Sequence, residues 1–267
     1  MLTSRYNPET EQLWREFQQL SKRVEELETP DAQSRAARAW GQAVGGLLSM
    51  PQWIGFWPMS NTNRLTTSVY DLGGNNLTLT NNNSATFGVS GVVPYTNFIT
   101  ASSQYLSRVS EDAFKITGSM WQQGWFYFTS DSMGNAAGLM GKWGPGTNRS
   151  YLLNKTAGDL IQATVTVDGT ALTQITSAAI TVNTWYCVTM VFVANTRLTL
   201  FVNGVETENT TSIPATVFDS TYAFEIGRLG TINYFGGRAA LCQLGVGALG
   251  DTVAKNAFHQ TRWAFGV

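Results

Sequence analysis

The sequence is short of the residues on which many enzymes and metal sites depend. Its 267 residues include one histidine, His259, and two cysteines, Cys187 and Cys242. A single histidine excludes a histidine-rich zinc site and leaves a Ser-His-Asp triad dependent on that residue alone. Two cysteines are too few for a disulfide framework. Because both lie in apolar runs, we expect small buried side chains, with a disulfide between them as the alternative.

Charge and long apolar runs are also scarce. Lys and Arg number 17 and Asp and Glu number 18, with no basic stripe, so we expect no nucleic-acid partner. No apolar run has the length of a membrane span, and Met1 to Tyr6 does not resemble the start of a secretion signal. We therefore expect no membrane partner and no secretion through a signal peptide.

The charge that is present lies unevenly along the chain. Residues 1–50 carry 13 of the 35 charged side chains, whereas Thr, Asn, Ser and Gly supply most of the polar surface afterwards. This shift in composition predicts a boundary near residue 50. We expect a helical arm over residues 1–50 and one β-domain over residues 51–267.

The arm carries an apolar seam. Asn7-Pro8-Glu9 is typical of a helix start, and apolar residues then recur at spacings of 4, 3, 4 and 3. The seam and a second apolar face after it contain Leu13, Phe17, Leu20, Val24, Leu27, Trp40 and Leu47. Such a seam must be buried, either on the chain's own sandwich or against other subunits. We favour oligomerisation or docking, which predicts a homo-oligomer, with a trimer as one form, or attachment to a larger assembly.

The centre of the chain reads as antiparallel strands. Trp185 to Val193 is rich in aromatic and β-branched residues, as in a strand buried on both faces. Leu198 to Val202 alternates with period two, and Asn203-Gly204 suits the positive φ angles of a type I′ turn. These segments predict an antiparallel hairpin.

Further phrases precede and follow this hairpin. They are Ile54-Gly-Phe-Trp-Pro-Met, Tyr70-Asp-Leu-Gly-Gly, Ser103-Gln-Tyr-Leu, Gly124-Trp-Phe-Tyr-Phe, Gly138-Leu-Met-Gly-Lys-Trp, Phe224-Glu-Ile-Gly-Arg-Leu and Phe235-Gly-Gly. The order of these phrases over roughly residues 53–258 resembles the laminin G-like, concanavalin A-like jelly-roll family. The resemblance implies an all-β fold, a jelly-roll sandwich of two antiparallel sheets.

Catalytic groups are missing from the expected positions. Glycosidases with this fold need paired carboxylates on the concave sheet. Glu206 and Glu208 follow a hairpin turn, Glu111-Asp112 lies in a polar connection, and His259 lies in a short C-terminal helix where we expect it to be exposed. We expect that the protein is not an enzyme.

The resemblance also implies a calcium site, and Asp71 occupies the position of a family aspartate. However, the family's later acids are absent from Leu241-Cys-Gln-Leu-Gly-Val-Gly, and calcium needs six to eight oxygen ligands. We expect no cofactor, and a structural role for Asp71 in its turn.

Two loops carry the residue types that hold sugars, which are aromatic rings and amide or hydroxyl groups. The candidate glycan-binding residues are Trp143, Asn148, Arg149, Tyr151, Asn233 and Tyr234. The alternative is that these aromatic residues belong to the core, as most do in a β-sandwich.

A bacteriophage virion protein accounts for the seam, the uncharged polar surface and the lack of catalytic groups together. We expect a non-enzymatic capsid decoration, head-fibre or tail-associated protein in the virion, anchored to other virion proteins by residues 1–50. The alternative is a lectin module that attaches to host-surface glycans. A glycosidase is disfavoured because the paired carboxylates are missing.

Overall fold

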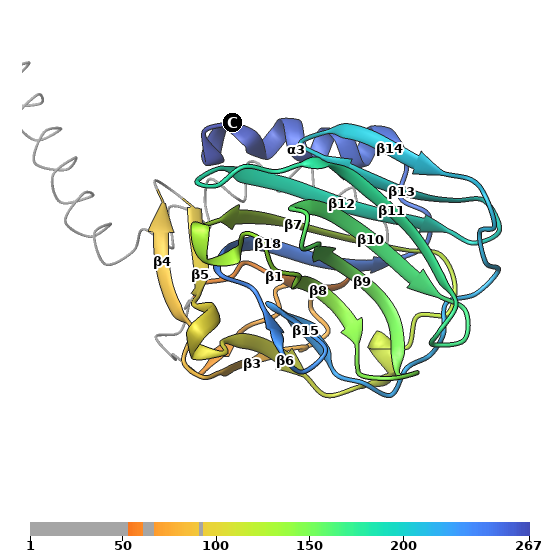
Figure 1. Cartoon of the computed structure of the whole chain (residues 1–267), viewed down its shortest axis with the longest axis horizontal. Coiled ribbons are helices and arrows are strands. Elements are labelled where there is room, and N and C mark those ends of the chain that lie inside the picture. The colour runs from red at the N-terminus through yellow and green to blue at the C-terminus, as the bar shows by residue number, and fades with distance from the viewer. Residues whose placement is uncertain (1–52, 61–66, 91–92) are drawn as a thin grey trace, which may run out of the picture.

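The computed structural model describes residues 53–60, 67–90 and 93–267. The arm predicted over residues 1–50, and with it the seam from Leu13 to Leu47, lies outside the described residues. The described chain forms two antiparallel sheets stacked face to face (Figure 1). This confirms the all-β, two-sheet architecture expected from the sequence.

Sheet A contains eight strands. They are β1 (Trp53–Trp57), β4 (Thr86–Ser90), β5 (Val93–Phe98), β7 (Met120–Phe128), β12 (Trp185–Val193), β13 (Arg197–Val202), β14 (Val205–Asn209) and β18 (Gly237–Val246). Their order is β14-β13-β12-β7-β18-β5-β4, and β1 also pairs with β18.

Sheet B also contains eight strands. They are β2 (Ser68–Val69), β3 (Leu79–Asn82), β6 (Tyr105–Arg108), β8 (Ala137–Trp143), β9 (Arg149–Lys155), β10 (Leu160–Thr166), β11 (Leu172–Ala179) and β15 (Phe224–Ile226). Their order is β11-β10-β9-β8-β15-β6-β3-β2. A separate hairpin pairs β16 (Arg228–Leu229) with β17 (Asn233–Tyr234).

Short 3-10 turns and one α-helix complete the described elements. The turns are η1 (Thr100–Ser102), η2 (Asp112–Phe114) and η3 (Ser130–Ser132), and the helix is α3 (Asp251–Phe265). Within the described ranges, no helix is long and apolar enough to cross a membrane.

The main core fills the space between the sheets. Trp57 stacks on Phe224 with ring centroids 5.0 Å apart, and Phe224 stacks on Phe114 at 4.9 Å. All three side chains are fully buried. Burying large aromatic side chains is worth about 1.5–3 kcal/mol each, so this stack is a main tie between the sheets.

The central hairpin forms as predicted. Strand β12 spans Trp185–Val193, and β13 meets β14 through the pair Val202 and Val205. Asn203 and Gly204 between them have φ angles of 50° and 76°. Both angles are positive, as a type I′ turn requires.

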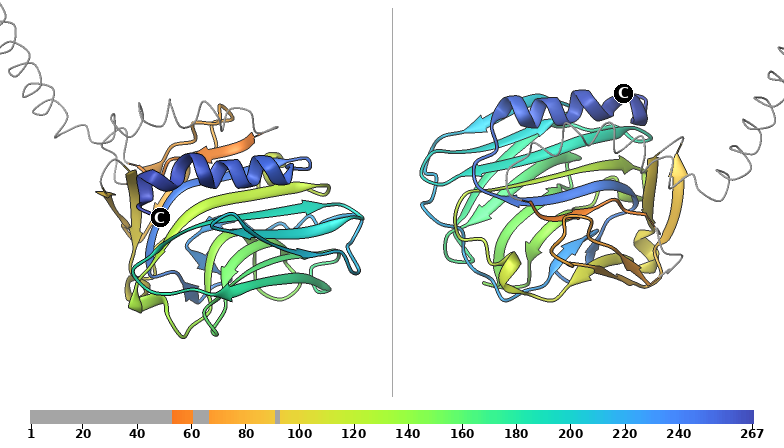
Figure 2. Two further views of the ribbon diagram at one scale, coloured as in Figure 1. Left: turned by 90° about the horizontal axis from the view of Figure 1, so that it is seen from above. Right: turned by 180° about the vertical axis from the view of Figure 1, so that it is seen from behind.

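Helix α3 covers the outer face of sheet A. Phe265 stacks on Trp125 at 3.9 Å and meets Trp185 edge-on at 4.9 Å, and Phe258 stacks on Trp125 at 5.9 Å. His259 lies in this helix with its side chain exposed, as expected. Figure 2 shows α3 on the side of sheet A, with sheet B on the opposite side of the molecule. The outer face of sheet B is therefore not covered by this helix.

The two cysteines are free and buried. Cys187 lies among the residues under α3, whereas Cys242 lies in the core between the sheets, so they sit on opposite faces of sheet A. Burial raises the pKa of the Cys187 thiol to about 12, which leaves it unreactive near neutral pH. The expectation of small buried side chains is confirmed.

Candidate binding face on sheet B

The outer face of sheet B is built from the alternate residues of β8, β9, β10 and β11. Ile161, Ala163 and Val165 of β10 point into the core, so Gln162 and Thr164 point outward. Strand pairing aligns these residues in two rows across the sheet. The first row is Gly138, Asn154, Gln162 and Thr176, and the second is Gly141, Leu152, Thr164 and Gln174.

Two glycines shape this face at β8. A Cβ on Gly138 would lie 2.1 Å from the Arg228 carbonyl oxygen, so the backbone of the β16–β17 hairpin packs directly on this strand. A Cβ on Gly141 would lie 2.4 Å from the Tyr151 carbonyl oxygen and 3.2 Å from the Leu152 side chain. Strand β8 therefore contributes backbone and no side chain to either row.

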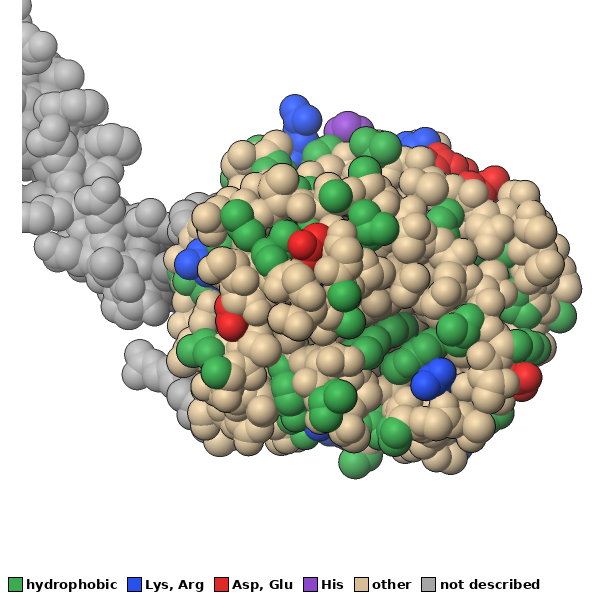
Figure 3. Space-filling model, viewed as in Figure 1, with side chains coloured by type: hydrophobic (Ala, Val, Ile, Leu, Met, Phe, Trp, Pro, Cys, Tyr) green, Lys and Arg blue, Asp and Glu red, His purple; other side chains and the backbone are tan. Residues whose placement is uncertain are grey.

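The rows have a buried floor and partly exposed sides. Leu152, Asn154 and Thr164 are 5% exposed or less, whereas Gln162 is partly exposed and Gln174 is exposed. Figure 3 shows this face hollowed, with hydrophobic side chains in the hollow and few charged side chains around it. A hollow with a buried, partly apolar floor and amide groups beside it has the composition of a small-ligand site.

Trp143 and Arg149 stand opposite each other at the end of β8 and β9. The Arg149 guanidinium carbon lies 5.6 Å from the Trp143 ring centroid, which is a cation–π distance. Both side chains are partly exposed. The Arg149 backbone is held in place because its carbonyl accepts a hydrogen bond of 2.8 Å from the Thr166 hydroxyl. The structure thus brings these two candidate residues together.

Asn148 shapes the loop between β8 and β9. Its Oδ1 accepts hydrogen bonds from the Ser220 hydroxyl at 2.7 Å and from the Thr221 backbone N–H at 3.0 Å. Its backbone carbonyl accepts the Gly144 N–H at 2.8 Å. The amide oxygen is therefore used within the protein, so Asn148 holds the loop in shape.

Tyr151 lies in the core and is removed from the candidate binding face. Its side chain is fully buried, and its hydroxyl donates a hydrogen bond of 3.2 Å to the Phe114 carbonyl oxygen. Tyr151 points inward because it lies two residues from Leu153, which also packs between the sheets. The alternative reading, that an aromatic residue of this loop belongs to the core, therefore holds for Tyr151.

The β16–β17 hairpin lies beside Trp143. The Gly230 N–H donates to the Trp143 carbonyl oxygen at 3.2 Å, and the Tyr222 hydroxyl donates to the Gly230 carbonyl oxygen at 3.1 Å. The two loops chosen from the sequence are therefore neighbours. Asn233 and Tyr234 lie on the second strand of this hairpin and are both partly exposed.

The Tyr234 ring lies beside strand β6. Its ring centroid lies 6.1 Å from that of Tyr105, and the Arg228 guanidinium lies 3.7 Å above the Tyr105 ring. Arg228 also forms an ion pair with Glu225 of β15. Burial raises the pKa of the Glu225 carboxyl, and the ion pair with Arg228 partly offsets this rise. The cluster clamps the hairpin onto sheet B.

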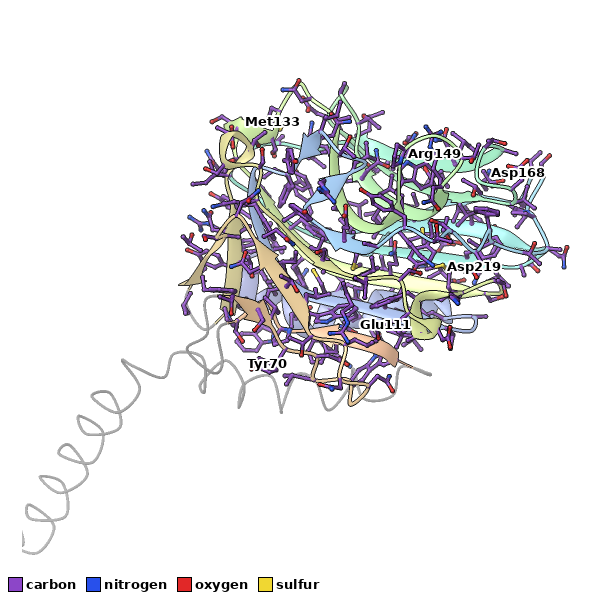
Figure 4. All side chains as sticks on the ribbon, turned by 90° about the horizontal axis from the view of Figure 1, so that it is seen from below. Tyr70, Glu111, Met133, Arg149, Asp168 and Asp219 are labelled. Carbon is purple, nitrogen blue, oxygen red and sulfur yellow. The ribbon has the colours of Figure 1, made fainter. Side chains whose placement is uncertain are left out.

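Two carboxylates lie on or near this face, and each has one basic partner. Glu225 pairs with Arg228, and Asp219 accepts a hydrogen bond of 3.2 Å from the buried Lys142 ammonium. Figure 4 shows Arg149 on the sheet B side, with Asp219 nearer the middle of the molecule. The acidic residues singled out from the sequence also have basic partners. The pairs are Arg108 with Glu111, Lys115 with Asp112, Lys255 with Glu206 and Arg197 with Glu208.

Comparison with known proteins agrees with this fold. Residues 109–241 match the family model described as the concanavalin A-like lectin/glucanases superfamily. The chain contains a concanavalin A-like jelly-roll domain. No curated protein sequence matches the chain.

Solved structures that resemble this jelly-roll domain include clostridial toxin binding domains. The binding domain of Paraclostridial Mosquitocidal Protein 1 has a TM-score of 0.62 at 11% identity, over 78% of this chain and 52% of that one. The botulinum neurotoxin serotype D ligand binding domain, solved with N-acetylneuraminic acid, has a TM-score of 0.61 at 10% identity, over 80% and 52%. The chain thus spans about half the length of these domains. At such identities the likeness shows the fold alone.

Asp71 of the jelly-roll domain holds backbone groups together. Its Oδ1 accepts the N–H groups of Phe56 at 2.9 Å and Gly73 at 2.7 Å, and its Oδ2 accepts the N–H of Leu77 at 3.1 Å. Three donors aimed at one carboxylate tie β1 to the turn that follows Tyr70. Among the described residues, no group of three or more His, Cys, Asp or Glu side chains gathers as a cation site would require.

The sequence analysis did not predict several residues of the binding face. Gln162 and Thr164 could have been predicted, because the apolar alternation of β10 places the residues between on the outer face. Gln174 belongs to β11 and joins this face through its pairing with Thr164. Leu152 and Asn154 could not have been predicted, because residues 149–155 include both faces without a clear alternation. Their outward direction follows only from strand pairing with β10.

Proposed function

We propose that the jelly-roll domain is a non-catalytic, lectin-like module that holds a sugar on the outer face of sheet B. The observation that supports this proposal most is that the partly exposed Trp143 lies beside two rows with amide and hydroxyl side chains, in a hollow of this face. A sugar ring presents an apolar face that packs on an indole, and its hydroxyls bond to amides such as Gln162 and Gln174. Trp143 supplies the first group and the rows supply the second.

The structural neighbours support a carbohydrate ligand. Two of them, the serotype D domain and the DC domain, were solved with N-acetylneuraminic acid and with SialylT respectively. Because they share only the fold with this chain, the position and identity of its ligand rest on the residues of sheet B.

The carboxylates support binding without hydrolysis. Glycoside hydrolysis needs two carboxyl groups about 5–9.5 Å apart across the bond that is broken. Among the outward residues of the described strands β8, β9, β10 and β15, Glu225 is the only acid, and Arg228 and the hairpin cover it. A glycan on this face would therefore be held and not cleaved.

A glycan array tests this proposal. The wild-type chain should bind at least one glycan saturably, and Trp143→Ala should weaken that binding at least about tenfold because it removes the stacking surface. Trp263→Ala is the matched control, since Trp263 is exposed on α3 at the opposite side of the molecule. Absence of any glycan ligand, or equal losses in the two variants, would contradict the proposal.

A second candidate role is that of a bacteriophage virion component. It is favoured by the heptad seam from Leu13 to Leu27 together with the sparsely charged body. In this role residues 1–50 attach the chain to a homo-oligomer or to other virion proteins, and the jelly-roll domain faces outward. A glycan-binding face and a virion location are compatible.

Sedimentation of the full chain tests the second role. We expect an oligomer that dissociates when Leu20 and Val24 are both changed to Lys, because charges at seam positions cannot be buried together. A wild-type chain that sediments as a monomer would contradict the oligomer. If the oligomer forms, removal of residues 1–50 should also prevent incorporation into phage particles, and retained incorporation would exclude the anchoring role.

A further inference from the structure

Arg149 lacks the acidic partner that most described basic residues have. Ion pairs hold Arg108, Lys115, Lys142, Lys155, Arg197, Arg228 and Lys255. Among the described residues, no carboxylate lies within ion-pair distance of Arg149, Arg238 or Arg262. Of these three, Arg149 is the one at the hollow of sheet B.

The Arg149 guanidinium is partly removed from water without compensation. Its Nε is buried and has no hydrogen-bond acceptor, although the group lies against the Trp143 ring. Leaving a charged donor partly desolvated and without a partner is unfavourable. Arg149 as a whole is partly exposed, so an anion would meet the terminal nitrogens of its guanidinium and not the buried Nε.

No carboxylate of the described residues forms an ion pair with Arg149. Lys142 pairs with Asp219, and both rows of sheet B consist of uncharged residues. Asn154, 5% exposed, also has an unpartnered Oδ1 in the first row. The face therefore presents a partly exposed guanidinium that has no acidic partner among the described residues.

We propose that the end of the hollow at Trp143 and Arg149 takes an acidic sugar unit, one that bears a carboxylate or a sulfate. This inference rests on the proposed function and narrows its ligand class. The planar guanidinium donates two parallel hydrogen bonds to the anion while the sugar ring packs beside it on Trp143. A nucleic acid fits less well, because a single guanidinium on a neutral face does not neutralise a run of phosphates.

The test compares acidic sugars with their neutral counterparts by calorimetry. The pairs are sialyllactose with lactose, trigalacturonate with its methyl ester, and a sulfated disaccharide with the unsulfated one. Wild-type protein should bind the acidic member of at least one pair about tenfold more tightly, and higher salt should weaken that preference. The first two pairs report a carboxylate and the third reports a sulfate.

Three variants assign the preference to its residue. Arg149→Gln should abolish the acidic preference while neutral sugars still bind, and Arg149→Lys should keep part of it because the charge remains without the paired donors. Arg238→Gln is the matched control, since Arg238 is also without an acidic partner and lies 4.6 Å over Tyr95 on sheet A. The Arg238→Gln variant should prefer acidic over neutral sugars as strongly as the wild-type protein does.

The outcomes separate the two proposals. Equal affinity for acidic and neutral sugars, with binding that still needs Trp143, overturns the acidic ligand and leaves the lectin-like function standing. A preference that survives Arg149→Gln, or that disappears in Arg238→Gln, overturns the role of Arg149. No binding of any sugar overturns both proposals together.

Discussion

At the residue scale, single polar side chains fix the positions of distant backbone segments. Asp71 joins Phe56, Gly73 and Leu77 through three N–H donors, over separations of up to 15 residues. Hydrogen bonds to a charged acceptor each contribute about 1.5–3 kcal/mol. This carboxylate therefore has a structural task that does not need a cation.

Asp71→Ala should lower the free energy of unfolding by about 2 kcal/mol or more, because three backbone donors lose a charged acceptor. Urea unfolding measures this. Asp168→Ala is the control: Asp168 bonds only to Thr170 and Ala171 in its own exposed turn, and its loss should have a smaller effect. A wild-type melting temperature that rises with calcium, and no longer does so in Asp71→Ala, would contradict the structural role.

Lys142 makes stability depend on pH. Burial lowers the pKa of its ammonium, and Asp219 only partly offsets this. Between that lowered pKa and the ordinary value of 10.5, the unfolded state binds more protons, so the free energy of unfolding rises with pH. Lys142→Met keeps the buried stem and should remove this contribution to the rise.

Urea unfolding from pH 7 to pH 10.5 measures the difference between wild type and Lys142→Met. The gain in stability with pH should be smaller in the variant. Lys115→Met, at a more exposed ion pair with Asp112, is the matched control and should leave the gain in place. Identical pH profiles for wild type and Lys142→Met would show that the buried ammonium is not penalised.

At the element scale, the β16–β17 hairpin packs on strand β8 at a glycine. Gly138 leaves no space for a Cβ beneath the Arg228 carbonyl, and Arg228 is held by Glu225 and Tyr105. The hairpin cannot move away without breaking this cluster. It therefore forms a fixed wall of the binding face.

Gly138→Ala should destabilise the protein by about 1–3 kcal/mol, because the new methyl group overlaps backbone and not a movable side chain. Gly118→Ala is the matched control, since a Cβ there meets no atom within 4 Å, and its effect should stay within about 0.5 kcal/mol. Thermal unfolding measures both. Equal stabilities would mean that the hairpin shifts freely.

At the scale of the whole molecule, the sequence predicted strand pairing between segments that are close in the chain. It did not predict contacts between residues that are far apart in the chain. Strands β12 and β13 and the turn at Asn203 and Gly204 follow one another in one short stretch of the chain, so their pattern is sufficient. The neighbourhood of Trp143 with Gly230 depends on a contact between residues nearly ninety positions apart. No periodicity encodes such a contact.

For the same reason, the sequence predicted only in part which residues of sheet B point into the core and which point outward. Tyr151 was predicted together with Trp143 as a glycan-binding residue. However, the strand register pairs Tyr151 with Lys142 and Trp143 with Arg149, with an irregularity between the two pairs that leaves one extra residue on β9. Tyr151 then joins the core, while Arg149 and Trp143 remain at the surface. The resemblance in phrase order predicted the fold but not which aromatic residue is available to a ligand.

The proposed function requires the outer face of sheet B to be the ligand-binding surface. A backbone NMR titration with a glycan that binds the wild-type chain tests this directly. We expect the amide signals that move to cluster at Trp143, Arg149 and Gln162, while those of α3 stay in place. Shifts confined to α3 or to the edge strands, with sheet B unchanged, would contradict it.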